Sequence, residues 1–264
     1  MSTVQLAETG IALVNVEGHP IVVWDLTEPT PSQLREWAKS FRQNYCVDDE
    51  LDDLMEGTGL SRADYLNSLV FPDAALKPGP SIRAGDFAEL LISDHVETLG
   101  YWVPRGKYAE KASRNESVKG VDVLGFKMEG GEPAPGDILL AFEIKAELTG
   151  KKYKNKLQVA INDSSKDCLR RGTSLNALKR RLIDKKRMDE AKRVSRFQNP
   201  KDNPYEYLSG AALVASSHLY DEVAIAASTV KDHKNKGRLS LMVVRGKDLM
   251  DLVHRLYEVA ANEA

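Results

Sequence analysis

A carboxylate and an ammonium group stand two residues apart at the end of an apolar run in this 264-residue chain. The run covers residues 138–142, and Glu143, Ile144 and Lys145 follow it without a turn residue. In a strand, side chains alternate between faces, so Glu143 and Lys145 share one face and Ile144 takes the other. Charges beside a buried strand are costly unless they are paired or used in chemistry. We therefore treat Glu143 and Lys145 as candidate catalytic residues.

Asp122 precedes Glu143 by 21 residues and stands near the start of a second strand-like segment, residues 118–128. The Gly- and Pro-rich connection between the two segments indicates a turn, so a hairpin would bring Asp122 to Glu143 and Lys145. Two close carboxylates repel unless a divalent cation lies between them, and Mg²⁺ prefers oxygen ligands and water. A lysine there can hold the attacking water or stabilise charge on a phosphate. The spacing predicts metal-assisted phosphodiester hydrolysis.

An Asp, about twenty residues and then Glu-x-Lys at the end of an apolar strand resembles the signature of the PD-(D/E)XK nucleases. The resemblance implies that Asp122 and Glu143 bind the metal and that Lys145 assists the attacking water. A helix ahead of the hairpin often supplies a further acid in that superfamily, and Glu89 in "GDFAELL" matches this catalytic, metal-binding role. Gln158, after the second strand, matches a position that contacts substrate or water.

The region that precedes these motifs, residues 1–80, is acidic. It holds 13 Asp and Glu residues against 5 Lys and Arg, a balance of −8. The Pro-rich segment 72–81 indicates a linker, so we place a domain boundary near residue 80. A helix in this region presents Leu34, Trp37 and Phe41 on one face. We expect the region to dock a partner protein through this face or through its acidic loop; the alternative is that it completes the nuclease core.

Residues 81–264 alternate between helical and strand patterns around the candidate residues. We expect a restriction-endonuclease-like PD-(D/E)XK core of the α/β class, with a mixed central sheet flanked by helices, and a small N-terminal α/β appendage. After the hairpin, helices are expected over residues 153–171 and 175–197, strands over 209–217, 222–229 and 238–245, and a final helix over 246–264.

A basic helical segment, residues 166–196, holds 12 Lys and Arg residues against 4 Asp and Glu, a balance of +8. Such a segment can contact the phosphate backbone of DNA without reading its sequence. The alternatives are a helix that projects into solvent and a contact with the acidic region of another subunit. The residues predicted to bind nucleic acid are Arg180, Arg181, Lys185, Lys186 and Arg187.

Other chemistries lack support in the sequence. Cys46 and Cys168 have no Cys or His cluster near them, which argues against disulfide scaffolding and structural zinc. There is no GxSxG, P-loop or GxGxxG pattern. No apolar run reaches the roughly 18 residues of a membrane helix, and the first residues lack a secretory pattern. We therefore expect a cytoplasmic protein without a membrane partner.

The chain length and the motifs "DFAELL", "GVDVLGF", "FEIKAEL" and "LQVAINDSSKD" together resemble the nuclease subunit of the Hachiman antiphage system. One position departs from the superfamily pattern, because Val121 stands where a proline often precedes the Asp. The resemblance implies a Mg²⁺-dependent deoxyribonuclease, with Mn²⁺ as an alternative cofactor, restrained and released by a superfamily 2 helicase. The other hypotheses are a stand-alone restriction-type or junction-resolving endonuclease, and an inactive nuclease fold that binds DNA or a partner.

Overall fold

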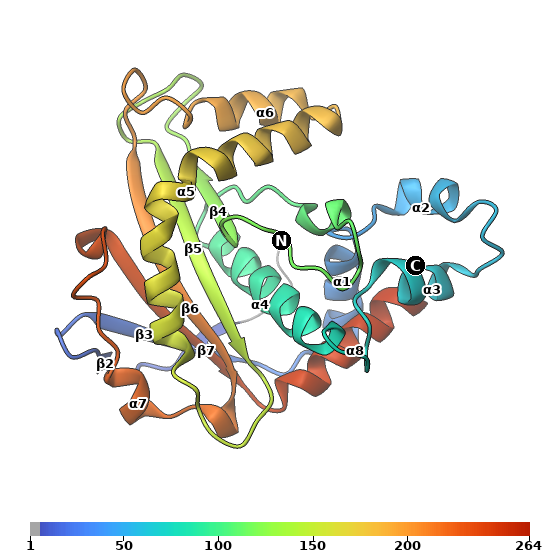
Figure 1. The fold of residues 1–264 in the computed structure, drawn as a ribbon, viewed down its shortest axis with the longest axis horizontal. Coiled ribbons are helices and arrows are strands. Elements are labelled where there is room, and N and C mark those ends of the chain that lie inside the picture. The colour runs from blue at the N-terminus through green and yellow to red at the C-terminus, as the bar shows by residue number, and fades with distance from the viewer. Residues whose placement is uncertain (1–5) are drawn as a thin grey trace.

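One mixed sheet runs through residues 6–264, the part of the chain described by the computed structural model (Figure 1). Its strands are β1 (Leu6–Glu8), β2 (Leu13–Val14), β3 (Pro20–Leu26), β4 (Val123–Lys127), β5 (Ile138–Glu147), β6 (Glu206–Ser216) and β7 (Leu239–Gly246). The strand order is β1-β3-β7-β6-β5-β4, and β2 pairs with β3. The central strands β3, β7, β6 and β5 are parallel, whereas β1, β2 and β4 pair antiparallel. The predicted mixed sheet is confirmed.

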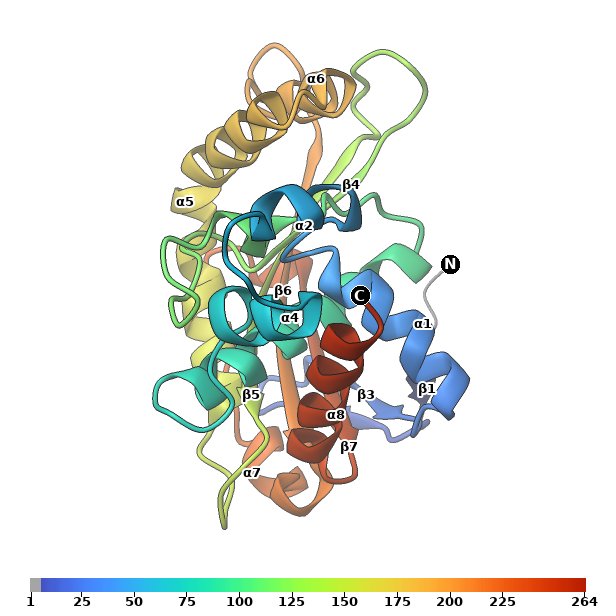
Figure 2. The same cartoon turned by 90° about the vertical axis from the view of Figure 1, so that its right-hand side faces the viewer.

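Helices cover both faces of this sheet. They are α1 (Pro31–Arg42), α2 (Asp48–Met55), α3 (Arg62–Tyr65), α4 (Gly79–Thr98), α5 (Lys156–Asp184), α6 (Met188–Ser195), α7 (Glu222–Ala226) and α8 (Leu249–Asn262). Figures 1 and 2 show α5 on one side of the sheet and α1, α4 and α8 on the other. Between residues 6 and 264, no helix has the length and apolar composition needed to cross a bilayer.

The side chains of β5 alternate between the two faces of the sheet. Leu140, Phe142 and Ile144 join the large core beneath α1, α4 and α8. Glu143 and Lys145 point to the opposite face, which α5 covers. The alternation predicted from the sequence therefore decides which side of the sheet carries the charged pair.

The N-terminal region shares the sheet and the core with the rest of the chain. β3 pairs along β7, and α1 lies against α8. Leu34, Trp37 and Phe41 are only 7%, 2% and 1% exposed. Trp37 packs on Phe87 of α4 and Phe41 on Tyr257 of α8. The prediction that these three side chains form a partner-docking face is wrong, because they belong to the core. The arrangement matches the alternative of one folded unit.

The two helices expected over residues 153–171 and 175–197 have different bounds in the structure. α5 continues without a break to residue 184, because Leu175 and Leu178 keep burying the same helix face. The chain breaks only at Lys186, whose φ of 57° lies in the left-handed region, and α6 follows. The basic segment is thus one long helix and one short one.

The strand expected over residues 222–229 is wrong, since the segment contains helix α7. The Asp221 side chain accepts a hydrogen bond from the backbone N–H of Ala224 and caps this helix. β6 and β7 pair directly with each other, so no position remains between them for a further strand. Val223 is consequently 82% exposed rather than part of the sheet.

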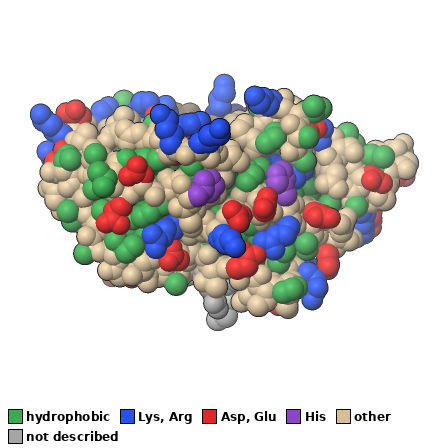
Figure 3. All heavy atoms as spheres, turned by 90° about the horizontal axis from the view of Figure 1, so that it is seen from below, with side chains coloured by type: hydrophobic (Ala, Val, Ile, Leu, Met, Phe, Trp, Pro, Cys, Tyr) green, Lys and Arg blue, Asp and Glu red, His purple; other side chains and the backbone are tan. Residues whose placement is uncertain are grey.

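Ion pairs join the acidic N-terminal region to elements near the C-terminus. On the face shown in Figure 3, Lys and Arg side chains are interspersed with Asp and Glu. Ion pairs join distant parts of the chain: Asp25 of β3 pairs with Arg245 of β7, and Glu28 pairs with Arg255 of α8. The −8 balance of residues 1–80 is therefore partly offset by cations from the C-terminal elements.

Candidate active site

The β4–β5 hairpin brings Asp122 to the strand that carries Glu143 and Lys145. The ladder between the two strands ends where Val123 faces Phe142. One residue before β4, Asp122 Oδ2 accepts a hydrogen bond of 2.8 Å from the backbone N–H of Ile144. The Asp122 side chain therefore continues the pairing with β5 where the backbone ladder stops. The hairpin spacing read from the sequence predicts this meeting.

Lys145 forms ion pairs with two carboxylates on the face covered by α5. Its Nζ lies 2.5 Å from Glu143 Oε1 and 3.0 Å from Asp163 Oδ2 of α5. The second oxygen of Asp163 pairs with Lys166 Nζ at 2.5 Å. Glu143 is 5% exposed, so its charge is compensated inside the protein rather than by bulk water.

Glu89 approaches the same end of the hairpin from α4. Its Oε2 accepts hydrogen bonds from Lys107 Nζ at 2.7 Å and from the Tyr108 hydroxyl at 2.8 Å. Lys107 Nζ also donates to the backbone carbonyl oxygen of Asp122 at 3.0 Å. Lys107 and Tyr108 begin the short 3₁₀ helix η2 (Lys107–Glu110). Lys107 thus contacts both the carboxylate of Glu89 and the backbone carbonyl of Asp122.

Burial and mutual repulsion shift the pKa values of carboxyl groups in the site. Burial raises the pKa of Asp122 well above its usual value, and the charges of Glu89 and Glu143 raise it further. Burial also raises the pKa of Glu143, although the Lys145 ammonium opposes this. For Lys145, burial lowers the pKa, but Glu143 and Asp163 raise it overall. A cation among these carboxylates would favour their ionised forms.

The predicted ligands have free oxygens that suit a hard divalent cation. Among the described residues, no hydrogen bond reaches Glu89 Oε1, Asp122 Oδ1 or Glu143 Oε2. Within residues 6–264, no group of three or more His, Cys, Asp or Glu side chains is arranged so that it could hold a metal ion. Mg²⁺ typically takes one or two carboxylates and keeps several waters. The site fits such a partly hydrated ion rather than a closed cage of protein ligands.

The sequence matches the HamA family over residues 7–260. The chain belongs to the HamA family. This membership makes it a component of the Hachiman antiphage defence system, so the predicted link to that system is confirmed. A search of the curated proteins found no match. The family match reaches from β1 into α8, and it therefore includes the N-terminal strands as well as the hairpin.

Two acids on α5 of this HamA family member lie near the site although no motif marks them. Asp163 joins Lys145 to Lys166. Asp167 is fully buried, and neither of its carboxylate oxygens has a hydrogen-bond partner among the described residues. Burial, together with the charge of Glu143, raises the pKa of Asp167 to about 7. The only sequence signal is the four-residue spacing, which places both acids on the sheet-facing side of the helix.

The side chains at the end of α5 that are predicted to contact nucleic acid differ in their exposure and in their ion pairs. Arg180 and Lys186 are exposed, and neither forms an ion pair within the described residues. Arg181 is largely buried and lies 3.4 Å from Glu110 Oε2. Burial lowers the pKa of Arg181, while Glu110 opposes this effect. Arg180 and Lys186 are thus the cations of this group that are open to a phosphate backbone.

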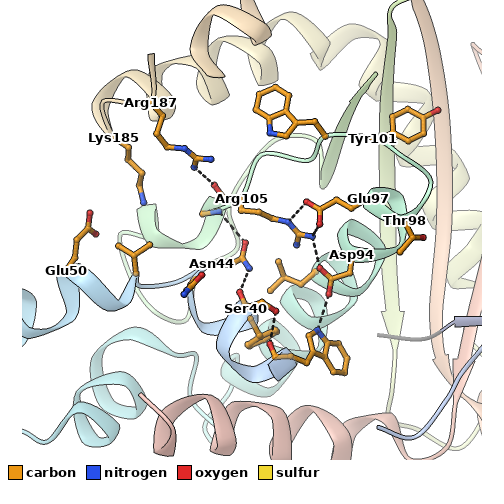
Figure 4. Close-up of a pocket in the computed structure, with 17 residues that line it drawn as sticks. Ser40, Asn44, Glu50, Asp94, Glu97, Thr98, Tyr101, Arg105, Lys185 and Arg187 are labelled. Atoms are coloured by element: carbon orange, nitrogen blue, oxygen red, sulfur yellow. Dashed lines mark hydrogen bonds and ion pairs between the residues drawn. The ribbon is translucent and has the colours of Figure 1, made fainter. Parts of the chain in front are cut away.

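Lys185 and Arg187 line a cavity of about 1080 Å³ between α1, the C-terminal half of α4 and the end of α5 (Figure 4). Arg105 also lines it and donates hydrogen bonds to Asp94 at 2.6 Å and to Glu97 at 2.7 and 3.0 Å. Arg187 reaches the backbone carbonyl of Arg105 at 3.3 Å. The Arg187 side chain is therefore held against the cavity wall by this hydrogen bond and is only partly exposed to solvent.

Gln158, predicted to contact substrate or water, anchors a neighbouring loop in the structure. Its Oε1 accepts a 2.7 Å hydrogen bond from the backbone N–H of Thr229, and its Nε2 donates to the Thr229 carbonyl at 3.1 Å. Nε2 also donates to Asn162 at 2.9 Å. These contacts fix the chain after α7 against α5, and a role toward substrate stays a prediction.

Proposed function

We propose that this HamA family member is a metal-dependent DNA nuclease of the Hachiman system. The proposal rests chiefly on the meeting of Asp122, Glu143 and Lys145 where the β4–β5 ladder ends. Among the described residues, one oxygen of each carboxylate receives no hydrogen bond, and the Lys145 ammonium pairs with Glu143. This combination of hard oxygen ligands and a fixed cation suits hydrolysis of a phosphodiester.

Asp122 and Glu143, with Glu89 nearby on α4, would hold Mg²⁺ or, as an alternative, Mn²⁺. When bound, such a cation polarises a phosphate oxygen and lowers the pKa of a water molecule. The raised pKa values of Asp122 and Glu143 support a cation here, since burial and carboxylate repulsion disfavour their ionised forms without one. The acids thus contribute binding and orientation rather than proton transfer.

Lys145 is the residue that we assign to the reacting phosphate. Its ammonium group donates hydrogen bonds and stabilises the negative charge that develops on phosphate oxygens. Glu143 and Asp163 hold this group from two sides, so its position is set before substrate arrives. Preorganised charge of this kind costs little reorganisation during the reaction.

DNA is the proposed substrate, and the exposed cations at the end of α5 are its proposed backbone contacts. Arg180 and Lys186 extend from the basic segment without protein ion-pair partners among the described residues. Such side chains neutralise phosphates and give affinity without sequence preference. The proposed binding surface therefore lies at and just after the end of α5, and the proposed hydrolytic groups lie at the β4–β5 hairpin.

A superfamily 2 helicase is the proposed partner that restrains and then releases the nuclease. The buried face of α1 cannot serve as its contact, so we assign the contact to the acidic helix α2. Asp49, Glu50, Asp52 and Asp53 of that helix are exposed, and α2 contains no basic residue. A charged rim of this kind speeds and orients docking more than it tightens it.

Cleavage of plasmid DNA by the purified protein tests this function. With Mg²⁺ or Mn²⁺ we expect nicked and linear products, and with EDTA we expect intact plasmid. Adding the helicase should suppress cleavage of undamaged DNA. A cleavage rate that is the same with and without the helicase would favour a stand-alone endonuclease. DNA binding without cleavage, under both cations and with or without helicase, would favour an inactive binding module.

A further inference from the structure

A strap formed by residues 105–111 lies along α4 and pairs with every acidic side chain of that helix. The strap cations meet the α4 acids in reverse chain order, so the strap runs antiparallel to the helix. The pairs are Arg105 with Asp94 and Glu97, Lys107 with Glu89, and Lys111 with Asp86.

Lys107 differs from the other strap cations because it also contacts the start of the catalytic hairpin. Its Nζ lies 2.7 Å from Glu89 Oε2 and 3.0 Å from the carbonyl oxygen of Asp122. The carbonyl oxygen of Val121 lies 3.4 Å away. The Lys107 side chain is only 16% exposed. One buried ammonium therefore ties α4 to the residue that precedes β4.

Within the part of the chain that the structure describes, the hydrogen bonds at Glu89 and Asp122 leave one oxygen of each carboxylate without a partner. Glu89 receives both of its side-chain bonds at Oε2, from Lys107 and from Tyr108. Asp122 accepts from the Ile144 N–H at Oδ2. A carboxylate that is fixed through one oxygen presents the other in a defined direction, as outer-shell partners do for metal ligands. Glu89 Oε1 and Asp122 Oδ1 are the oxygens presented in this way.

We propose that Lys107 is a positioning residue that holds Glu89 beside Asp122, so that both can bind the same divalent cation. The inference rests on the proposed function, because it assigns a role around that metal site. Lys107 contacts Glu89 Oε2 and backbone carbonyls rather than the two free oxygens. The Lys107 ammonium therefore fixes the positions of Glu89 and Asp122 and does not occupy the place of the divalent cation.

Mn²⁺ binding to the full-length protein, measured by isothermal titration calorimetry, tests this role. Lys107→Met keeps the chain length and removes the ammonium, and we expect about 10- to 100-fold weaker Mn²⁺ affinity. Lys107→Arg keeps a cation and should recover part of this affinity. The matched control is Lys111→Met, which removes a neighbouring strap cation whose partner Asp86 is not a predicted ligand. This control should keep wild-type Mn²⁺ affinity.

The outcomes separate the positioning role from the proposed function. Wild-type protein that binds Mn²⁺ and cuts DNA, with unchanged Mn²⁺ affinity in folded Lys107→Met, overturns the positioning role alone. Tighter Mn²⁺ binding in that variant also overturns it, because Lys107 would then compete with the cation. If Lys107→Met does not fold, Lys107→Gln removes the ammonium and keeps a polar side chain, and unchanged Mn²⁺ affinity in that folded variant overturns the inference. Wild-type protein without Mn²⁺ binding or cleavage overturns the proposed function and this role together.

Discussion

Lys145 lies between Glu143, two residues earlier in the same strand, and Asp163 on the following helix. Side chains two apart in a strand share a face, so the first contact follows directly from the sequence. The second depends on how α5 lies across the sheet. Lys166 holds the far oxygen of Asp163 and limits its movement. Asp163 can therefore fix the direction of the Lys145 ammonium.

Replacing Asp163 by Asn should slow DNA cleavage while leaving substrate binding nearly unchanged. The amide keeps the shape of the side chain but removes the charge that helps to hold Lys145, so we expect kcat to fall about 10- to 100-fold. Steady-state cleavage of plasmid DNA measures kcat and KM separately. Asp163→Glu should restore part of the rate. A normal kcat in Asp163→Asn would show that Glu143 alone positions Lys145.

The candidate residues differ in how far the sequence could reveal them. Asp122, Glu143 and Lys145 depend on a hairpin and on strand alternation, which are local patterns. The contact of Asp163 with Lys145 depends on which face of α5 is turned toward the sheet. Lys107 lies in a connection between α4 and β4 whose sequence has no periodic pattern. Both roles arise from tertiary packing, so no spacing rule marks them.

At the scale of elements, the exposed cations where α5 ends should govern DNA affinity. We expect the double substitution Arg180→Gln and Lys186→Gln to weaken binding to all sequences. The slope of log K against log salt should become shallower by about 0.9 for each DNA phosphate that the variant no longer neutralises. Fluorescence anisotropy over a series of salt concentrations measures both quantities.

Substituting Arg35 and Lys39, which are exposed on α1, provides the matched control for charge removed elsewhere. This control should leave the salt slope unchanged. If Arg180→Gln with Lys186→Gln behaves like the control, the end of α5 faces something other than DNA.

The elements that the sequence predicts correctly are those with strong local signals. The β4–β5 hairpin has two apolar runs and a Gly- and Pro-rich connection, and β7 leads directly into the amphipathic α8. Residues 222–226 are ambiguous, because a short Val- and Ala-containing run suits either a strand or a helix. The direct pairing of β6 with β7 decides the case, and that pairing is not local.

At the scale of the whole molecule, a protein that starts at Ser81 should not fold cooperatively. Truncation removes β3, the partner of β7, and exposes the core around Phe87 and Tyr257 that Trp37 and Phe41 cover. Urea unfolding monitored by circular dichroism should show no cooperative transition, whereas the full chain should show one. A cooperative transition with native helix content would mean that residues 81–264 form an independent domain.

Charge along the sequence says less about the whole molecule than apolar periodicity does. The −8 and +8 segments suggest separate partners, yet Asp25, Glu28 and Glu110 pair with cations from later elements. Apolar spacing in α1 indicates a buried face, but the sequence does not say whether the cover is another protein or this chain. Only the packing of α1 on α8 resolves that question.

Mg²⁺-dependent cleavage by wild-type protein and by Lys145→Ala is the most direct test of the central claim. We expect Lys145→Ala to cut DNA about 10²- to 10⁴-fold more slowly, because the substitution removes a positioned charge at the phosphate. Its urea midpoint should stay close to that of the wild type. Lys152→Ala, an exposed lysine in the following loop, should cut at the wild-type rate. A folded Lys145→Ala protein that cuts as fast as the wild type would contradict the assignment of this site.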